Sequence, residues 1–168
     1  MSPNSSPVKA QKPEVVLNRW CQQLSSPFQK PWTQTNILYH YVPLFGAIDF
    51  HLLALNVLNP KLLRNLGRSI GLNVDCTNLF LAGSIAGGTL HLYNRRHMGG
   101  LTLSHRAMYS TYLGSLSVLG SVLLWAIGSR VVPGNPLFRT LLAVGSAWSM
   151  LKVKLSFLDH LDAGAKQR

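Results

Sequence analysis

Residues 107–129 read AMYSTYLGSLSVLGSVLLWAIGS, and this run of 23 residues contains no charged side chain. Arg106 precedes the run and Arg130 follows it. Uncharged apolar runs of about 18 residues or more are typical of membrane spans, because ~20 helical residues cross the ~30 Å hydrocarbon core of a bilayer. A helix is the expected conformation, since it satisfies its own backbone polar groups in lipid. The stretch therefore predicts an all-α, polytopic helical membrane protein.

Three other apolar segments are candidates for further spans. Residues 37–58 are long enough, although Asp49 lies within them. Residues 76–94 are a run of 19 uncharged residues, with Asp75 before it and a pair of arginines after it. Residues 140–151 are an uncharged run of only 12 residues, which is too short to span. The segment reaches the necessary length if Arg139, just before it, extends its charge to the interface. We predict about four transmembrane helices, or three if the first or the fourth segment stays at the membrane surface.

The rest of the chain predicts a single domain with polar ends. Residues 31–161 form one transmembrane bundle in this interpretation. Residues 1–30 are expected to be a disordered tail plus a short amphipathic helix, and residues 162–168 a free tail. The segment KLLRNLGRSIGL, residues 61–72, predicts a short amphipathic connector helix between the first two spans.

The chain is strongly basic, with 16 Lys and Arg against 5 Asp and Glu and a net charge of +11. Such a balance points either to nucleic acid or to an anionic membrane surface. The basic residues stand in short groups between apolar runs, whereas nucleic-acid binders gather them on one face or arm. We therefore expect anionic lipid headgroups as partners, and no nucleic acid.

The placement of Lys and Arg also predicts the orientation in the membrane. With four spans, eleven of the 16 lie on the side that holds both termini and residues 95–106, and five lie on the other side. The positive-inside rule then places both termini in the cytosol or the mitochondrial matrix. All five tyrosines fall at or near the same interface, which agrees with this orientation.

The N-terminal region bears on the organelle. Residues 1–30 lack the apolar core of a secretory signal. A serine-rich, acid-poor start precedes the segment PEVVLNRWCQQL, residues 13–24, whose apolar side chains share a helix face and favour mitochondrial targeting. We expect a mitochondrial inner-membrane protein with both termini on the matrix side. The alternative is the endoplasmic reticulum membrane with cytosolic termini.

Small residues recur at helical spacing in two predicted spans. Gly83 and Gly87 form a GxxxG pattern within residues 76–94. Within residues 107–129 the small residues form a seam at spacings of 3, 4 and 7, which includes Ser110, Gly114, Ser117 and Ser121. Because lipid supplies no hydrophobic drive between helices, such seams favour close backbone packing. We predict that both faces pack against neighbouring helices, and a pore-lining serine face is the alternative.

Three histidines, His40, His91 and His105, are the candidates for a cofactor site, at similar depth on different predicted spans. Histidines from facing helices can ligate haem, but the sequence contains no HExxH or CxxCH motif. Cys21 and Cys76 lack metal-binding spacing and are expected to be reduced thiols. We therefore expect interfacial histidines and neither cofactor nor metal. A haem-binding electron-transfer bundle is the alternative.

Asp49 is an intramembrane polar residue, and a carboxylate in mid-bilayer costs ~2.5–3.5 kcal/mol on insertion scales. A small channel or transporter that uses Asp49 is therefore one hypothesis. With five acidic residues and no phosphate loop, nucleophile elbow or paired carboxylates, an enzyme with catalytic residues is not expected. The main hypothesis is a non-catalytic accessory subunit or assembly factor that packs laterally against other membrane proteins of a larger complex.

Overall fold

All regular structure in the described part of the chain is helical, which confirms the all-α prediction for these residues. The computed structural model describes residues 31–69, 76–132 and 134–165. In chain order they form α2 (Gln34–Asn36), the π-helical turn η2 (Ile37–Tyr41), α3 (Val42–Leu58), α4 (Pro60–Ser69), α5 (Thr77–Tyr93), the 3-10 turn η3 (Arg96–Met98), α6 (Leu103–Val131) and α7 (Pro136–Ala165). The amphipathic helix expected within residues 1–30 lies outside the described residues.

Three helical segments are long and apolar enough to cross a membrane: Gln34–Leu58, Leu103–Val131 and Pro136–Ala165, with 25, 29 and 30 residues. Their outer faces carry large apolar side chains in the open, such as Leu123 at 61% and Leu141 at 64% exposure. Contiguous apolar surface of this kind is rare on soluble monomers and normal where acyl chains replace water. The fold is therefore that of an integral helical membrane protein. Helix α5 is shorter, with 17 residues.

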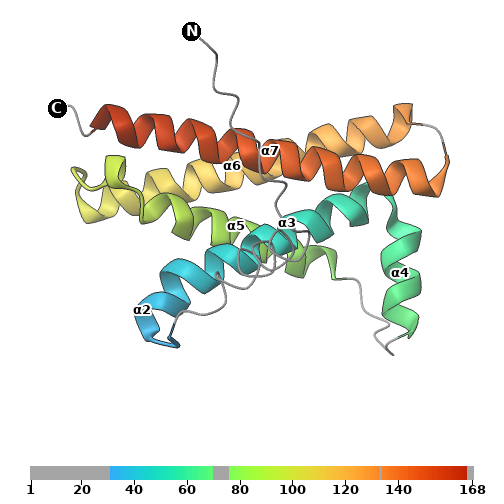
Figure 1. Ribbon diagram of the computed structural model, residues 1–168, viewed down its shortest axis with the longest axis horizontal. Helices are drawn as coiled ribbons and strands as arrows, with labels where there is room; N and C mark the ends of the chain where they lie inside the picture. Colours follow the sequence, from blue (N-terminus) through green and yellow to red (C-terminus); the bar gives the residue numbers. More distant parts are fainter. Residues whose placement is uncertain (1–30, 70–75, 133, 166–168) are drawn as a thin grey trace, which may run out of the picture.

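Asparagine and proline define the turns at one end of the bundle. Helix α3 ends at Asn59, and Pro60 begins α4, where its missing N–H is tolerated. The Asn59 side-chain amide donates to the carbonyl of Pro136 at 3.2 Å and to the hydroxyl of Thr140 at 3.0 Å. These bonds tie the end of α3 to the start of α7, and Figure 1 shows α4 and the α6–α7 turn at the same end of the molecule.

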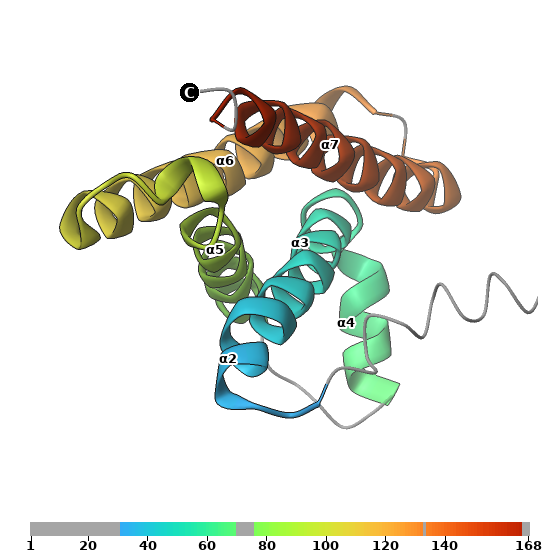
Figure 2. The ribbon, with the colours of Figure 1, turned by 60° about the vertical axis from the view of Figure 1, so that its left-hand side comes forward.

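The bundle has two layers, with α6 and α7 lying over α3 and α5 (Figures 1 and 2). Helix α3 is central, because it packs against α5, α6 and α7. Phe50 and Leu53 of α3 join Val118 and Trp125 of α6 in the buried core. The rings of Phe50 and Trp125 are 4.9 Å apart, and the indole N–H of Trp125 donates to the hydroxyl of Ser146 on α7 at 3.1 Å. The core is thus aromatic at the centre and linked across three helices.

Helices α3 and α5 cross where two glycines meet. A Cβ atom on Gly46 would lie 2.6 Å from the Cα of Gly87, and a Cβ atom on Gly87 would lie 2.6 Å from the Cα of Gly46. These distances leave no room for a side chain, so only glycine at both positions lets the two backbones approach this closely. One turn earlier on α5, Gly83 lies against the carboxylate of Asp49. The GxxxG face of α5 is therefore directed at α3 of the same chain.

Helix α7 continues to Ala165, beyond the expected end of the bundle at residue 161. The expected free tail, residues 162–168, therefore begins with helical residues. The reason is a tertiary contact, because the carboxylate of Asp162 accepts a hydrogen bond from the backbone N–H of His97 at 3.0 Å. This contact holds the last turn against the connection between α5 and α6.

The close crossing predicts an unequal response to two identical substitutions. Gly87→Ala should lower the free energy of unfolding by about 1–3 kcal/mol, because its methyl group would overlap the backbone of α3. Gly145→Ala on α7 is the control, since no side chain or neighbouring helix in residues 31–69, 76–132 or 134–165 lies within 4 Å of its Cβ position and alanine favours a helix by ~1 kcal/mol over glycine. Unfolding of the detergent-purified protein, followed by circular dichroism, measures both. Equal stability of the two variants would contradict the close approach of α3 and α5.

Candidate functional site

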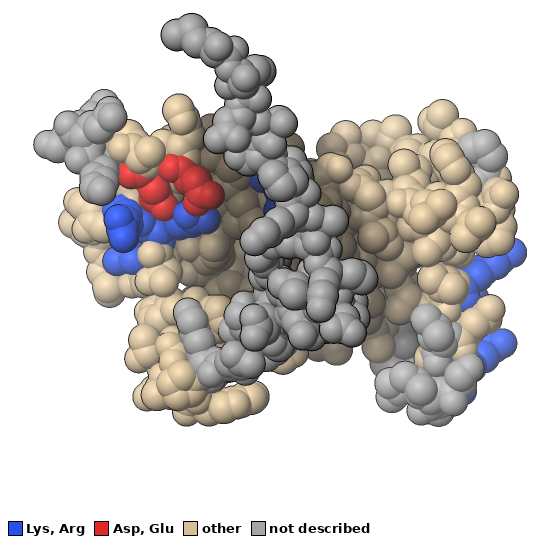
Figure 3. All heavy atoms as spheres, viewed as in Figure 1, with Lys and Arg blue, Asp and Glu red and all other residues tan. Residues whose placement is uncertain are grey.

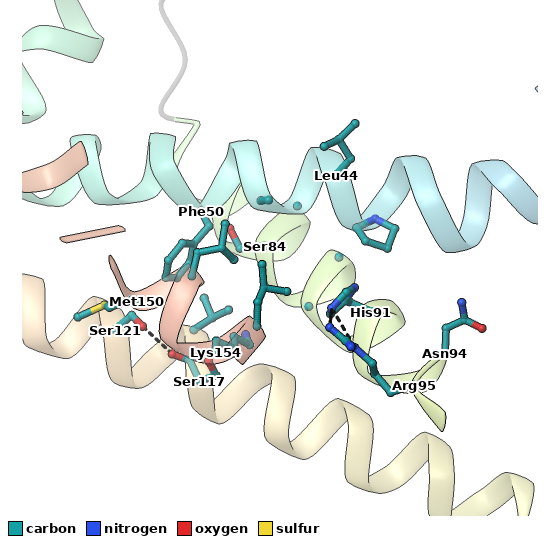
Figure 4. Close-up of a pocket in the computed structure, with 18 of the residues that line it drawn as sticks. Leu44, Phe50, Ser84, His91, Asn94, Arg95, Ser117, Ser121, Met150 and Lys154 are labelled. Atoms are coloured by element: carbon teal, nitrogen blue, oxygen red, sulfur yellow. Dashed lines mark hydrogen bonds between the residues drawn. The ribbon is translucent and has the colours of Figure 1, made fainter. Parts of the chain in front are cut away.

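A cavity of about 480 Å³ lies between α3, α5, α6 and α7 (Figure 4). This volume falls within the ~300–1,000 Å³ that is typical of ligand sites. Its larger apolar lining residues are Pro43, Leu44, Phe50, Val118, Met150, Leu151 and Leu155. Its polar lining side chains are Tyr39, His40, Ser84, His91, Asn94, Arg95, Ser117, Ser121 and Lys154. An apolar wall with a few polar groups is the usual composition of a small-molecule site.

Lys154 brings a positive charge into this cavity from α7. Its side chain is half-buried and reaches across to α5, where Nζ lies 3.6 Å from the position that a Cβ atom on Gly88 would occupy. Figure 4 shows Lys154 between the serines of α6 and His91 of α5. Within residues 31–69, 76–132 and 134–165 its ammonium has no hydrogen bond or ion pair. A buried cation without a partner is costly, so this position calls for an anion.

Arg95 also lines the cavity, but its charge is already compensated. Its Nη1 lies 2.6 Å from the carboxylate of Asp159 and 3.1 Å from that of Asp162. Both aspartates stand in the last turns of α7, beyond its apolar part. His97 adds a backbone bond and a ring nitrogen 2.7 Å from Asp162. Figure 3 shows the acidic atoms of this face beside basic ones, toward the end that holds the C-terminus.

The surroundings of Asp162 keep its carboxyl group ionised. Partial burial would raise its pKa, but hydrogen bonds from the backbone and ring of His97 and from Arg95 outweigh burial and bring the pKa to about 2. The side chain of Asp162 is only 16% exposed and that of Asp159 is 69% exposed. The ionised carboxylate of Asp162 is therefore the more buried of the two that bind Arg95. Through this contact α7 and the α5–α6 connection meet at one end of the bundle.

Of the three candidate histidines, the structure brings two to one cavity. His40 and His91 line it, whereas His105 is exposed and bonds to the hydroxyl of Thr102 at 2.6 Å. His91 Nε2 accepts hydrogen bonds from Arg95 at 3.0 and 3.3 Å, so this nitrogen is occupied and carries no proton. Within the described residues no group of three metal-ligating side chains occurs. Because Arg95 occupies Nε2 of His91, the arrangement of side chains does not fit a haem that His91 ligates through this nitrogen.

Asp49 lies apart from the cavity. Its half-buried carboxylate packs on Gly83, and it has no hydrogen bond or ion pair with the part of the chain that the structure describes. His51, two residues further along α3, bonds instead to the carbonyl of Ala47 in its own helix at 2.7 Å. Asp49 and the histidines therefore form no relay across these described elements.

The small residues of the predicted seam on α6 lie on the inner face of this helix. Ser110, Gly114 and Ser121 are buried, and Ser117 and Ser121 line the cavity. A Cβ atom on Gly114 would lie 2.7 Å from the hydroxyl of Thr89 on α5, whose oxygen is buried without a partner among the described residues. Ser121 donates to the carbonyl of Ser117 at 2.8 Å, within its own helix. The seam therefore packs against α5 at Gly114 and forms part of the cavity wall at Ser117 and Ser121.

Lys154 and Arg95 are site candidates that the sequence interpretation treated only as part of the basic flanks. A signal for Lys154 is present in the sequence, because Ala143, Ala147 and Leu158 stand at helical spacing from it and are buried in the structure. Lysine on the small-residue face of a helix points inward. No comparable signal exists for Arg95, whose two carboxylate partners lie more than 60 residues away.

Comparison of the chain with models of protein families, with curated proteins and with solved structures finds no match. The described residues form the bundle of an integral helical membrane protein, with a cavity between its helices that the charged side chain of Lys154 lines.

The two aspartates that share Arg95 should contribute unequally to stability. Asp162→Ala should lower the free energy of unfolding by about 1–3 kcal/mol, because it leaves the backbone N–H and ring nitrogen of His97 without their acceptor and removes one of the two carboxylates that Arg95 contacts. Asp159→Ala, the exposed counterpart, should change it by about 0–1 kcal/mol. Because the folded pKa of Asp162 is lowered from 3.8 to about 2, its contribution is fully present above pH 3.8 and is lost as the pH falls toward 2. Thermal unfolding in detergent measures both variants, and a larger loss for Asp159→Ala would contradict the described geometry.

Proposed function

We propose that this chain is a non-catalytic accessory subunit or assembly factor of a larger membrane complex in the mitochondrial inner membrane. The proposal rests on the outer face of α6. Gly120 is exposed, and no side chain or neighbouring helix of the described residues lies within 4 Å of its Cβ position. The residues at helical spacing around it are exposed apolar side chains, namely Leu113, Leu116, Leu123, Leu124 and Ile127.

A glycine at the centre of an exposed apolar face supports lateral packing. In lipid, helices associate through close contact, and small residues permit it. The glycines of α5 and Gly114 of α6 are already used within the chain, so they leave Gly120 as an unused point of approach. On α7, Gly145 offers the same arrangement between exposed Leu141 and Trp148. Helices α6 and α7 therefore each carry an exposed face suited to packing against a neighbouring membrane protein.

Four spans are part of the proposal. The 17 residues of α5 extend about 26 Å at 1.5 Å per residue, which is close to the thickness of a hydrocarbon core. Helix α5 packs along α6 and along α3, which together with α2 and η2 forms the segment Gln34–Leu58, and both Gln34–Leu58 and α6 are long enough to span. With α5 spanning, the chain runs up and down four times, and residues 95–102 share a side with both termini. The basic excess of residues 1–30 then favours the matrix for that side.

Assembly into a complex can be tested through Gly120. A C-terminally tagged protein, solubilised in mild detergent, should migrate on a native gel well above a monomer or dimer of the 18.5 kDa chain and bring other subunits with it. Gly120→Leu should shift it to a small species without lowering its own thermal stability, since the site is open. Gly134→Leu, on the exposed turn between α6 and α7, is the control and should stay in the complex. A wild-type protein that migrates at monomer size, without co-purifying subunits, would contradict the proposal.

Topology gives an independent prediction. Three exposed positions, Lys61, Gly100 and Gly134, are changed singly to cysteine in a chain whose Cys21 and Cys76 are serine. In intact inner membranes a membrane-impermeant maleimide should label Lys61→Cys and Gly134→Cys, and should label Gly100→Cys only after permeabilisation. Three spans without α5 would place Lys61→Cys and Gly134→Cys on opposite sides. Recovery of the protein in endoplasmic reticulum membranes would contradict the mitochondrial location.

A further inference from the structure

We propose that the cavity binds the phosphate group of an anionic phospholipid, with Lys154 as the cation that holds it and an acyl chain along the apolar wall. The inference starts from the two cations of the cavity. Arg95 is neutralised by two aspartates and also donates to His91. Lys154 has no such partner among the described residues, although its half-buried side chain lines the cavity. The charge that the cavity leaves uncompensated is therefore that of Lys154.

His91 supplies a second group suited to an anion. Because its Nε2 accepts from Arg95, the neutral ring carries its proton on Nδ1. That N–H has no hydrogen-bond partner within the described residues, and the ring lines the same cavity as Lys154. An ammonium and an imidazole N–H in one cavity are donors only, so their natural ligand is an oxyanion such as a phosphate or carboxylate.

The rest of the lining favours a lipid over a free inorganic anion. Phe50, Leu151 and Leu155 present apolar surface to the cavity, and the hydroxyls of Ser84 and Ser121 donate to carbonyls of their own helices. A small hydrated anion would leave that apolar wall in contact with water, whereas an acyl chain would cover it. In Figure 4 Phe50 and Met150 lie toward one end of the cavity and Arg95 and Asn94 toward the other. The cavity is therefore amphipathic along its length.

The position of Lys154 along α7 agrees with a headgroup phosphate. It precedes Asp162, which pairs with the α5–α6 connection, by eight residues, or about 12 Å of helix. Tyr93 on α5 stacks on Tyr39, and the Arg106 guanidinium lies 4.3 Å from the Tyr93 ring, which is the arrangement of an aromatic belt. Basic pockets between helices at this level commonly accept anionic lipid headgroups.

Binding is tested on the purified full chain in a neutral detergent. The probes are dioleoylphosphatidylglycerol, dioleoylphosphatidylcholine and inorganic phosphate, and the readouts are the Tm and native mass spectrometry of bound lipid. Phosphatidylglycerol should raise the Tm and remain bound in the mass spectrum, and the other two probes should have little effect. Lys154→Gln should weaken the apparent Kd for phosphatidylglycerol at least about tenfold, since a charge-assisted hydrogen bond is lost.

Lys152→Gln is the matched control, because Lys152 stands two residues away on the same helix and lies over the exposed Trp148 ring at 5.1 Å. It should bind the lipid like the wild type, and Lys154→Arg should retain most of the affinity. Lys154→Gln should itself fold, since it removes a half-buried charge that has no partner among the described residues, and an unchanged far-ultraviolet spectrum checks this.

Each contrary result overturns the proposal in a different way. An equal shift with inorganic phosphate would show a site for a free anion, and an equal shift with phosphatidylcholine would show an apolar cavity without charge selectivity. Equal loss of binding in Lys152→Gln and Lys154→Gln would place the lipid on the outer surface of the bundle. None of these measurements requires the larger complex, so failure of the lipid site is distinguishable from failure of the assembly role.

Discussion

The contact between Gly46 and Gly87 determines how the rest of the bundle is arranged. Helix–helix association in lipid depends on van der Waals contact, and the backbones of α3 and α5 meet here so closely that neither glycine leaves room for a Cβ atom. With α5 held at this distance, the other faces of α3 remain available to α6 and α7. A side chain at either glycine would separate the pair and change the angle at which both upper helices pack.

The same small residues that permit the crossing also create the cavity. Gly46, Ala47, Gly87 and Gly88 line it and contribute almost no side-chain volume. At the crossing itself the backbones fill the space, but away from it the helices diverge and short side chains leave a gap. Lys154 extends into that gap and reaches the backbone of α5 at Gly88. Packing and cavity are therefore two consequences of one pattern, and the charge enters because a flexible lysine can cross the gap.

The sequence predicted most of the secondary structure because hydrophobic length is a local property. The uncharged run 107–129 lies within α6, Leu103–Val131, and the segment 37–58 corresponds to Gln34–Leu58. It did not predict which helix faces Gly83 and Gly87, because a GxxxG pattern fits a partner chain as well as a neighbouring helix. Nor did it predict the pairing of Arg95 with Asp162. That contact depends on the rotation of α7 about its axis, which the spacing of apolar residues in a lipid-exposed helix determines poorly.

The difference between Arg95 and Lys154 has a simple physical consequence. Both are cations at the same cavity, but only Arg95 meets carboxylates, because Asp159 and Asp162 stand in turns of α7 that reach the α5–α6 connection. Lys154 stands deeper, where the described chain offers serine hydroxyls already bonded to their own helices and an apolar wall. In a low-dielectric bundle such a charge favours the binding of an anion. An anion at Lys154 would join α7 to α5 and so stiffen the layer that carries the outer face of Gly145.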